Sequence, residues 1–426
     1  MERFDVVVVG VGGMGSAALY HLARRGKRVL GLERFDVLHD QGSSHGLTRI
    51  IRLAYFEHPD YVPLLRRAYE LWRELEAEAD EQLLHVTGIV EGGEGIREGV
   101  LRACADHDIP HEVLNGREVS RRFPAYALPP ELEIVFQADG GFVVPERCIV
   151  THVEGALARG AVVRARERVL EWDDTEAGVR IRTDRGEVVA ERVVFTAGAL
   201  SRDVARLPAG MVRGVRQALA WLQPSRPEIF ASDRMPVFNL VLDGEHFYGF
   251  PAFGIPGFKL GRYDHFGTGG DPDAISREPT LEDEAPLRAF AERYFPEGAG
   301  PTIALKTCLF EPSPDEHFIV DEHPESDRVV VAAGLLRPRL QVLLRDRRDP
   351  RRPRDRRVDA PRHRALPPRP VRTVISCASQ RGRSVCMLHA GSASRLCAVS
   401  SSSSWRSQGS RSSTLDCRDR ARRTTR

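Results

Sequence analysis

Three glycines near the amino terminus have the spacing of a dinucleotide-binding turn. Gly10, Gly12 and Gly15 form a G-x-G-x-x-G motif directly after the apolar run 4–9. Glycines in this pattern permit a tight turn, let backbone N–H groups approach a pyrophosphate, and place its charge at the positive end of the following helix. Glu33 stands eighteen residues after Gly15, where a carboxylate can accept hydrogen bonds from both ribose hydroxyls. These residue types and spacings predict nucleotide binding.

The segments that follow the motif have the order that it requires. A helix is predicted over 14–25 because the apolar pattern stops at Gly26, and a second apolar strand is predicted over 28–32. A strand, glycine turn, helix and strand make the first part of a nucleotide-binding domain. The alternative is a glycine turn without a ligand, and this context makes it less favoured.

Two apolar strands far along the chain end in Ala-Gly, at Gly198 and Gly334. A glycine at a strand end lets the backbone approach a ligand closely, so we expect both strands to join the first sheet. Hydrophobic periodicity predicts further elements. They are helices over 61–79 and 145–159, a strand over 162–165, a hairpin of 169–172 with 179–183, and antiparallel strands within 212–262.

This order of elements predicts an α/β protein with a Rossmann-like nucleotide-binding domain and an inserted, mainly antiparallel sheet domain for the substrate. We assign to the nucleotide-binding domain residues 1–82, 146–212 and 306–334, and to the substrate domain residues 83–145 and 213–305. Residues 335–426 form a separate, basic tail.

Composition and cysteine usage restrict the setting of the protein. The 426 residues contain no apolar run long enough for a membrane span, and the seven cysteines have no paired-disulfide spacing. The first strand begins at Phe4, which leaves no room for a cleaved signal peptide. We therefore expect a cytoplasmic protein without a membrane partner, and we predict no metal site.

The tail differs sharply from the rest of the chain. Residues 335–426 hold 24 of the 62 basic residues, all of them Arg, and only 6 of the 60 acidic residues. They contain no Lys, Glu, Phe, Tyr or Asn, so we expect this stretch to be disordered. Clustered Arg can bind nucleic acid without sequence preference, but this composition is also typical of a GC-rich gene translated out of frame. We favour the second interpretation and do not expect a nucleic-acid partner.

A frameshift near Gly334 is consistent with the codons. Residues 335–342 can be encoded so that a shift of one base reads Phe-Ser-Gly-His-Gly-Phe-Lys-Phe, and the shifted frame can continue as an amphipathic helix. Because the third bases are chosen freely, the codons permit this reading without requiring it. We predict that the native carboxyl-terminal segment was lost there.

The chain as far as Gly334 resembles the monomeric sarcosine oxidase and N-methyl amino acid oxidase family of FAD enzymes. The shifted-frame Ser-Gly-His-Gly-Phe-Lys is also a signature of that family. The most specific matches are GSSHGLTRIIR at 42–52, YGFP at 248–251, KLG at 259–261, KTC at 306–308 and PDEHFI at 314–319.

The resemblance implies a role for each matching residue. Cys308 would form a thioether to the flavin, although a lone cysteine is more often a buried structural residue. Arg52 would bind the substrate carboxylate, because a guanidinium matches two carboxylate oxygens. Lys259 would support that site and Tyr248 would close it, while Arg49 would lie near the flavin face. The FAD contacts would come from Gly10, Gly12, Gly15, Glu33, Ser43, Arg49, Gly198, Cys308 and Gly334.

The sequence departs from the family pattern in three places. An apparent one-residue insertion after KLG leaves either Tyr263 or His265 in the position of a family histidine, and we assign His265 to the catalytic set. Phe310 stands where some members have a tyrosine, which leaves the substrate open. The family lysine and glycines of the lost segment are absent, so the chain as written is expected to bind FAD poorly or not to fold stably.

The resemblance implies FAD-dependent oxidation of a secondary N-methyl amino acid such as sarcosine. Hydride transfer to the flavin would be followed by release of formaldehyde, the primary amino acid and hydrogen peroxide. The partners would be a small secondary amine and molecular oxygen, and the protein would be a monomer. Two alternatives stay open. One is a related amino acid oxidase or dehydrogenase with noncovalent FAD, and the other is an inactive, basic-tailed binding protein.

Overall fold

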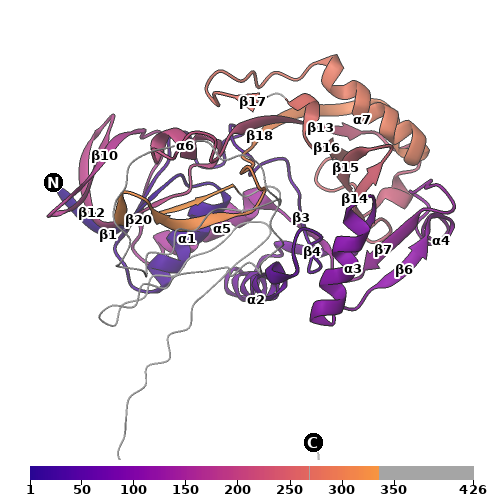
Figure 1. Ribbon diagram of the computed structural model, residues 1–426, viewed down its shortest axis with the longest axis horizontal. Helices are drawn as coiled ribbons and strands as arrows, with labels where there is room; N and C mark the ends of the chain where they lie inside the picture. Colours follow the sequence, from indigo (N-terminus) through magenta and orange to yellow (C-terminus); the bar gives the residue numbers. More distant parts are fainter. Residues whose placement is uncertain (268, 335–426) are drawn as a thin grey trace, which may run out of the picture.

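The computed structural model describes residues 1–267 and 269–334. The predictions about the tail, which concern its disorder, its frameshift and its binding of nucleic acid, lie outside the described residues. Two lobes stand side by side, each built around its own β-sheet, with α2 (Val62–Ala79) below the junction between them (Figure 1).

The first lobe contains the predicted nucleotide-binding sheet. Its strand order is β10-β11-β12-β1-β2-β9, with β20 beside β12 and β19 beside β20. The strands are β1 (Glu2–Val9), β2 (Val29–Leu32), β9 (Val162–Arg164), β10 (Val169–Thr175), β11 (Gly178–Thr183), β12 (Gly186–Phe195), β19 (Ile319–His323) and β20 (Ser326–Ala333). The central pairs β1–β12, β1–β2, β2–β9 and β12–β20 are parallel. The predicted return of the strands before Gly198 and Gly334 to this sheet is thereby confirmed.

Two helices cover one face of this sheet. They are α1 (Gly13–Arg24) and α5 (Pro145–Leu157), which pack against each other. Residues 15–23 of α1 are all buried, because the helix lies between the sheet and α5. Val6 and Val8 of β1 meet Leu19 and Leu22 of α1 in this core, as the continuous apolar runs of the sequence require.

The second lobe contains a larger and mostly antiparallel sheet. Its order is β17-β13-β16-β15-β14-β5-β7-β6, and β18 pairs with β13. The strands are β5 (Ile89–Gly93), β6 (Glu112–Asn115), β7 (Glu133–Gln137), β13 (Gly214–Leu222), β14 (Val237–Leu242), β15 (Glu245–Phe250), β16 (Phe258–Arg262), β17 (Gly269–Gly270) and β18 (Thr302–Phe310). The helices of this lobe are α3 (Ile96–His107), α4 (Gly116–Arg122) and α7 (Leu281–Tyr294).

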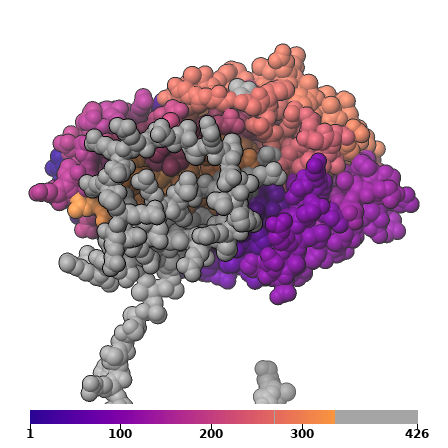
Figure 2. Space-filling view, viewed as in Figure 1, coloured from indigo at the N-terminus to yellow at the C-terminus, as the bar shows by residue number. Residues whose placement is uncertain are grey.

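Two distant chain segments meet in the second lobe. The parallel pair β5–β14 joins residues 89–93 to residues 237–241. In Figure 2 the purple, earlier part of the chain and the salmon, later part adjoin on the surface of this lobe. The predicted domain boundaries stay a prediction, and the one at residue 306 falls inside β18, which pairs with β13 on both sides of that residue.

A small third sheet, β3-β8-β4, connects the lobes. Its strands are β3 (Arg49–Ile51), β4 (Leu84–Val86) and β8 (Gly141–Val143). β3 begins at Arg49, and Arg52 directly follows its last residue. The third sheet therefore places both arginines at the junction of the lobes. Within residues 1–267 and 269–334, no helix is both long and apolar enough to cross a bilayer, and no group of three or more His, Cys, Asp or Glu is arranged to hold a metal.

Candidate active site

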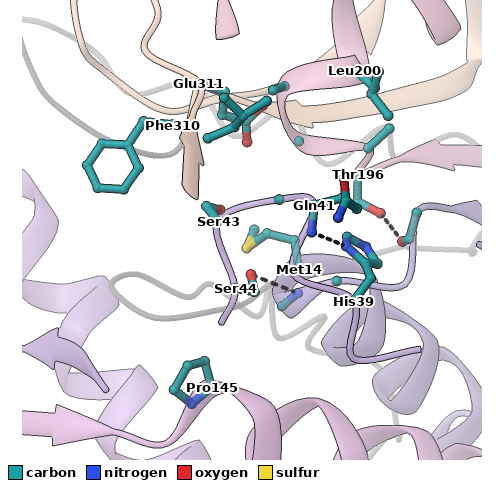
Figure 3. Close-up of a pocket in the computed structure, with 18 of the residues that line it drawn as sticks. Met14, His39, Gln41, Ser43, Ser44, Pro145, Thr196, Leu200, Phe310 and Glu311 are labelled. Atoms are coloured by element: carbon teal, nitrogen blue, oxygen red, sulfur yellow. Dashed lines mark hydrogen bonds between the residues drawn. The ribbon is translucent and has the colours of Figure 1, made fainter. Parts of the chain in front are cut away.

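One cavity of about 510 Å³ brings the nucleotide motif together with the predicted substrate residues. Met14, Ser43 and Ser44 lie in it between Phe310 and Glu311 on one side and Pro145 on the other (Figure 3). The predicted site residues that line the cavity are Gly10, Gly12, Glu33, Ser43, Arg49, Arg52, Gly198 and Tyr248. Gly15, Lys259, His265, Cys308 and Gly334 are not among its lining residues.

The glycine motif forms a tight turn with open space above it. A Cβ on Gly15 would overlap the carbonyl oxygen of Gly10, so only glycine permits this approach. A Cβ on Gly12 would meet nothing nearer than the Ser44 Oγ at 4.0 Å. Gly12 is the N-cap of α1 and has no side-chain acceptor. The N–H of Gly13 donates to the Ser44 Oγ at 3.3 Å, so the suitability of this turn for an anion rests on the next N–H groups and on the positive end of the helix.

Glu33 is held in an ionised form at the end of β2. Its carboxylate accepts hydrogen bonds from the backbone N–H of Val11 at 2.8 Å and of Phe35 at 2.9 Å, and His39 Nε2 lies 3.5 Å away. Burial raises the pKa of Glu33, but these three contacts outweigh it and keep the pKa below its ordinary value. A carboxylate has room for further donors, so Glu33 can also accept from ribose hydroxyls.

Lys259 lies behind the cavity and fixes the loop that precedes β3. Its Nζ donates to the carbonyl oxygen of Gly46 at 2.6 Å, and to the carbonyl oxygen and Oγ1 of Thr48 at 3.0 Å each. Burial lowers the pKa of Lys259 well below its ordinary value, and the charge of Arg49 lowers it further. Glu146 holds the same loop from the other side, where it accepts from the N–H of Gly46.

Arg49 projects from β3 into the cavity. Its Nη1 donates to the carbonyl oxygen of Thr48 at 2.8 Å, and its Nη2 donates to the carbonyl oxygen of Ser43. These bonds fix a positive charge beside the Ser43–Ser44 segment, where an electron-rich ring system would be stabilised by it.

Arg52 is buried and already paired with two carboxylates. Its Nη2 contacts both oxygens of Glu57 at 2.8 Å, its Nε lies 3.1 Å from Glu91, and its guanidinium lies 4.2 Å from the centre of the Tyr55 ring. Burial lowers the pKa of Arg52, but the two carboxylates more than compensate, and the pKa lies above its ordinary value. Glu57 and Glu91 were not predicted from the sequence, where neither belongs to a motif.

Three aromatic side chains form another wall of the cavity. The ring of Tyr263 lies 4.8 Å from that of Tyr248 and 6.2 Å from that of Phe310, measured between centroids. His265 is placed elsewhere, fully buried with its Nε2 3.3 Å from Asp283 at the start of α7. Asp264, between them, has a positive φ of 50°, which turns the chain away from the cavity. Of the two alternatives that the sequence left open, only Tyr263 lines the cavity.

Cys308 is fully buried on β18, one residue before the cavity wall formed by Leu309, Phe310 and Glu311. The N–H of Leu309 donates to the carbonyl oxygen of Gly42 at 3.2 Å, which ties this strand end to the glycine- and serine-rich loop. Burial raises the pKa of the Cys308 thiol, whereas the charges of Arg49 and Lys259 act to lower it. The sulfur is therefore close to the cavity without lining it.

Glu311 is a buried carboxyl group that the sequence did not single out. It lines the cavity beside Phe310, accepts from the backbone N–H of Gly334, and its Oε2 has no partner among the described residues. Burial raises its pKa to about 8, so it is largely protonated at neutral pH.

Comparison with known proteins gives the family. Residues 5–342 match the family described as FAD dependent oxidoreductase. The chain belongs to this family. It is 36% identical over 343 residues to a monomeric sarcosine oxidase from a Bacillus species, across 78% of this chain and 88% of that protein. It is 32% identical over 339 residues to an N-methyl-L-tryptophan oxidase from Yersinia pestis, across 78% and 90%.

Solved structures agree with this assignment. The amino acid oxidase NikD, essential for nikkomycin biosynthesis, is 26% identical, with a TM-score of 0.69 over 79% of this chain and 90% of that chain. A glycine oxidase from Geobacillus kaustophilus shares the fold, with a TM-score of 0.65 at 20% identity over 79% and 90%. The protein is therefore an FAD-dependent amine or amino acid oxidoreductase.

The cavity of this oxidoreductase fits FAD. The open space over Gly12 and the N–H groups of α1 suit the pyrophosphate, and the ionised Glu33 suits a ribose. Ser43, Arg49 and Gly198 line the cavity beyond them and would hold the rest of the cofactor.

Proposed function

We propose that the protein oxidises the N-methyl group of a secondary amino acid such as sarcosine, with FAD as the electron acceptor and molecular oxygen as the final oxidant. The observation that carries this proposal is the buried guanidinium of Arg52 in the same cavity as the nucleotide motif. The two relatives named above, an oxidase of sarcosine and one of N-methyl-L-tryptophan, support the substrate class.

Bound FAD supplies the acceptor for a hydride from the N-methyl carbon, and oxygen then takes the electrons as hydrogen peroxide. Hydrolysis of the resulting imine gives formaldehyde and the primary amino acid. The substrate amine must be unprotonated, because a protonated nitrogen has no lone pair with which to expel a hydride. The charge of Arg49 in the cavity disfavours the ammonium form and so favours the reactive one, whereas the charge of Arg52 is balanced by Glu57 and Glu91.

We assign each side chain a role in that reaction. Arg52 binds the substrate carboxylate, and Tyr248 and Tyr263 close the cavity around the N-methyl end. Lys259 acts through the loop that it holds, since it fixes the backbone of Gly46 and Thr48. His265 keeps its predicted catalytic assignment only as a proposal, supported by its place shortly after KLG and not by its position in the fold.

We further propose that Cys308 is joined covalently to the flavin and that the enzyme is a cytoplasmic monomer, as the name of the sarcosine oxidases supports for the oligomeric state. A noncovalent-FAD oxidase or dehydrogenase is the second candidate, and the placement of Cys308 outside the cavity lining favours it.

Acid precipitation of the FAD-loaded protein separates the two candidates. If the link exists, the yellow colour stays with the wild-type pellet and moves to the supernatant in Cys308→Ser. The matched control is Cys104→Ser, a buried cysteine on α3, which should keep the colour in the pellet. Colour in the wild-type supernatant would remove the covalent link and favour the second candidate. Formation of formaldehyde and peroxide from sarcosine tests the activity itself.

A further inference from the structure

Arg52 is held from two sides by carboxylates that belong to different parts of the fold. Glu57 follows β3, lines the cavity and contacts Arg52 Nη2. Glu91 belongs to β5 in the second lobe, is not a cavity-lining residue and contacts Arg52 Nε at 3.1 Å. Glu57 therefore binds the guanidinium of Arg52 on the side of the cavity, and Glu91 contacts the guanidinium from the opposite direction.

Glu91 is itself fixed by two amide side chains. Its Oε2 accepts from Gln137 Nε2 at 2.8 Å, and its Oε1 accepts from Asn239 Nδ2 at 3.1 Å. Neither amide can turn over freely, because Gln137 Oε1 accepts from the backbone N–H of Ala54 at 3.0 Å and Asn239 Oδ1 bonds His246 Nε2 at 2.5 Å. The carboxylate is thus locked in one orientation toward Arg52.

Burying this carboxylate is costly. The side chain of Glu91 is 0% exposed, and its burial raises its pKa to about 7 although the charge of Arg52 acts to lower it. An apolar residue would fill the same space in the sheet without that penalty. Among the described residues Glu91 makes one ion pair, and its partner Arg52 lines the cavity. A perturbed buried charge at a cavity is a candidate for a functional role.

We propose that Glu91 is a positioning residue for Arg52. Its carboxylate forms an ion pair with Nε at 3.1 Å, without the alignment of a hydrogen bond, and so holds the guanidinium by charge with its Nη groups facing the cavity, where they bind the carboxylate of the amino acid substrate. An incoming carboxylate that binds both Nη groups must share Nη2 with Glu57 or replace it. In either case the contact between Glu91 and Arg52 remains. It keeps the guanidinium in place when Glu57 moves away. This inference rests on the proposed function, because it takes the substrate to carry a carboxylate.

The test compares two variants that differ in what they preserve. In Glu91→Gln the negative charge beside Arg52 is lost. The new amide N–H₂ also faces the N–H₂ of Gln137, so two donors oppose each other. We therefore expect both the stability of the fold and the position of Arg52 to change. In the double variant Glu91→Gln with Gln137→Glu the two groups exchange places. The carboxylate now carried by β7 accepts from the amide now carried by β5 and from the Ala54 N–H. The double variant therefore restores the pattern of donors and acceptors without restoring the charge at Arg52 Nε.

The readout is the binding of acetate to the full chain loaded with FAD, measured by calorimetry at about pH 8.5, where Glu91 with its pKa of about 7 is ionised, and neutral acetamide is the matched probe. We expect both variants to bind acetate about tenfold more weakly than the wild type, which is the low end of the coupling between two close buried charges. The Tm should fall in Glu91→Gln and recover in the double variant, and acetamide binding should not change. A tenfold rise in the KM for sarcosine with little change in kcat should accompany the weaker acetate binding.

Three results would overturn the proposal. They are recovery of acetate affinity together with the Tm in the double variant, unchanged acetate affinity in Glu91→Gln, and acetate binding by the wild type that Arg52→Met does not weaken. Failure of the proposed function is distinct. If acetate binding depends on Arg52 and Glu91 but no N-methyl amino acid is oxidised, the positioning role stands and the proposed reaction does not.

Discussion

Two buried carboxyl groups contribute to the pH dependence of this fold. Burial raises the pKa of Glu311 to about 8 and that of Glu91 to about 7, against about 4.5 for an ordinary glutamate. The folded state holds these protons more tightly than the unfolded state does. Each group therefore contributes stability that is fully present below pH 4.5 and is lost as the pH rises through its folded pKa.

Glu311→Gln should isolate one of these contributions. A glutamine cannot ionise, so the Tm of the variant relative to that of the wild type should rise between pH 4.5 and about 8 and then level off. The scale is about 1.4 kcal/mol for each unit of pKa difference. Thermal unfolding at pH 5 and pH 8.5 measures it, with exposed Glu282→Gln as the control. A Tm difference for Glu311→Gln that is the same at both pH values would contradict the assigned burial of an uncompensated carboxyl.

The turn into α1 combines close packing with open space. Gly15 packs against the backbone of Gly10, whereas Gly12 faces the cavity. Gly15 therefore has a structural role in this motif, and Gly12 leaves space for the ligand.

Two alanine substitutions should separate these two roles. Gly15→Ala forces α1 away from β1, so it should lower the unfolding free energy of the free protein by about 2 kcal/mol or more. Gly12→Ala should change that free energy by less than about 0.5 kcal/mol, because its methyl enters open space, yet it should weaken FAD binding at least tenfold. Denaturant unfolding and flavin fluorescence titration in a Cys308→Ser background measure both. Unweakened FAD binding by Gly12→Ala would mean that the pyrophosphate does not sit over this turn.

Local patterns were enough to predict the elements around the motif. The strand–turn–helix opening, Glu33 and the strands that end at Gly198 and Gly334 follow from short-range spacing, and the structure has them in one sheet. Glu91 could not be found in this way, because its partner Arg52 follows β3 of the connecting sheet and meets β5 only in the folded molecule. The choice between Tyr263 and His265 depended on the positive φ of Asp264, which an insertion in the sequence does not reveal.

Both lobes contribute to the cavity of the whole molecule. Gly12, Glu33 and Arg49 come from the first lobe or the connecting sheet, and Tyr248 and Phe310 come from the second. The family match ends at residue 342 of 426, close to the proposed frameshift at Gly334. Resequencing the gene tests that proposal. A verified reading frame through codon 335, with no base missing or added, would rule it out.

Anaerobic mixing of the FAD-loaded protein with sarcosine, followed by the visible absorbance of the oxidised flavin, tests the central claim most directly. The account predicts that sarcosine or another N-methyl amino acid bleaches the flavin. The colour should return when oxygen is admitted, with release of peroxide. Bleaching of the Arg52→Met variant should require at least tenfold more substrate. It would be contradicted if N-methyl amino acids left the colour unchanged while a primary amino acid bleached it, or if the chain with its frame restored bound no flavin.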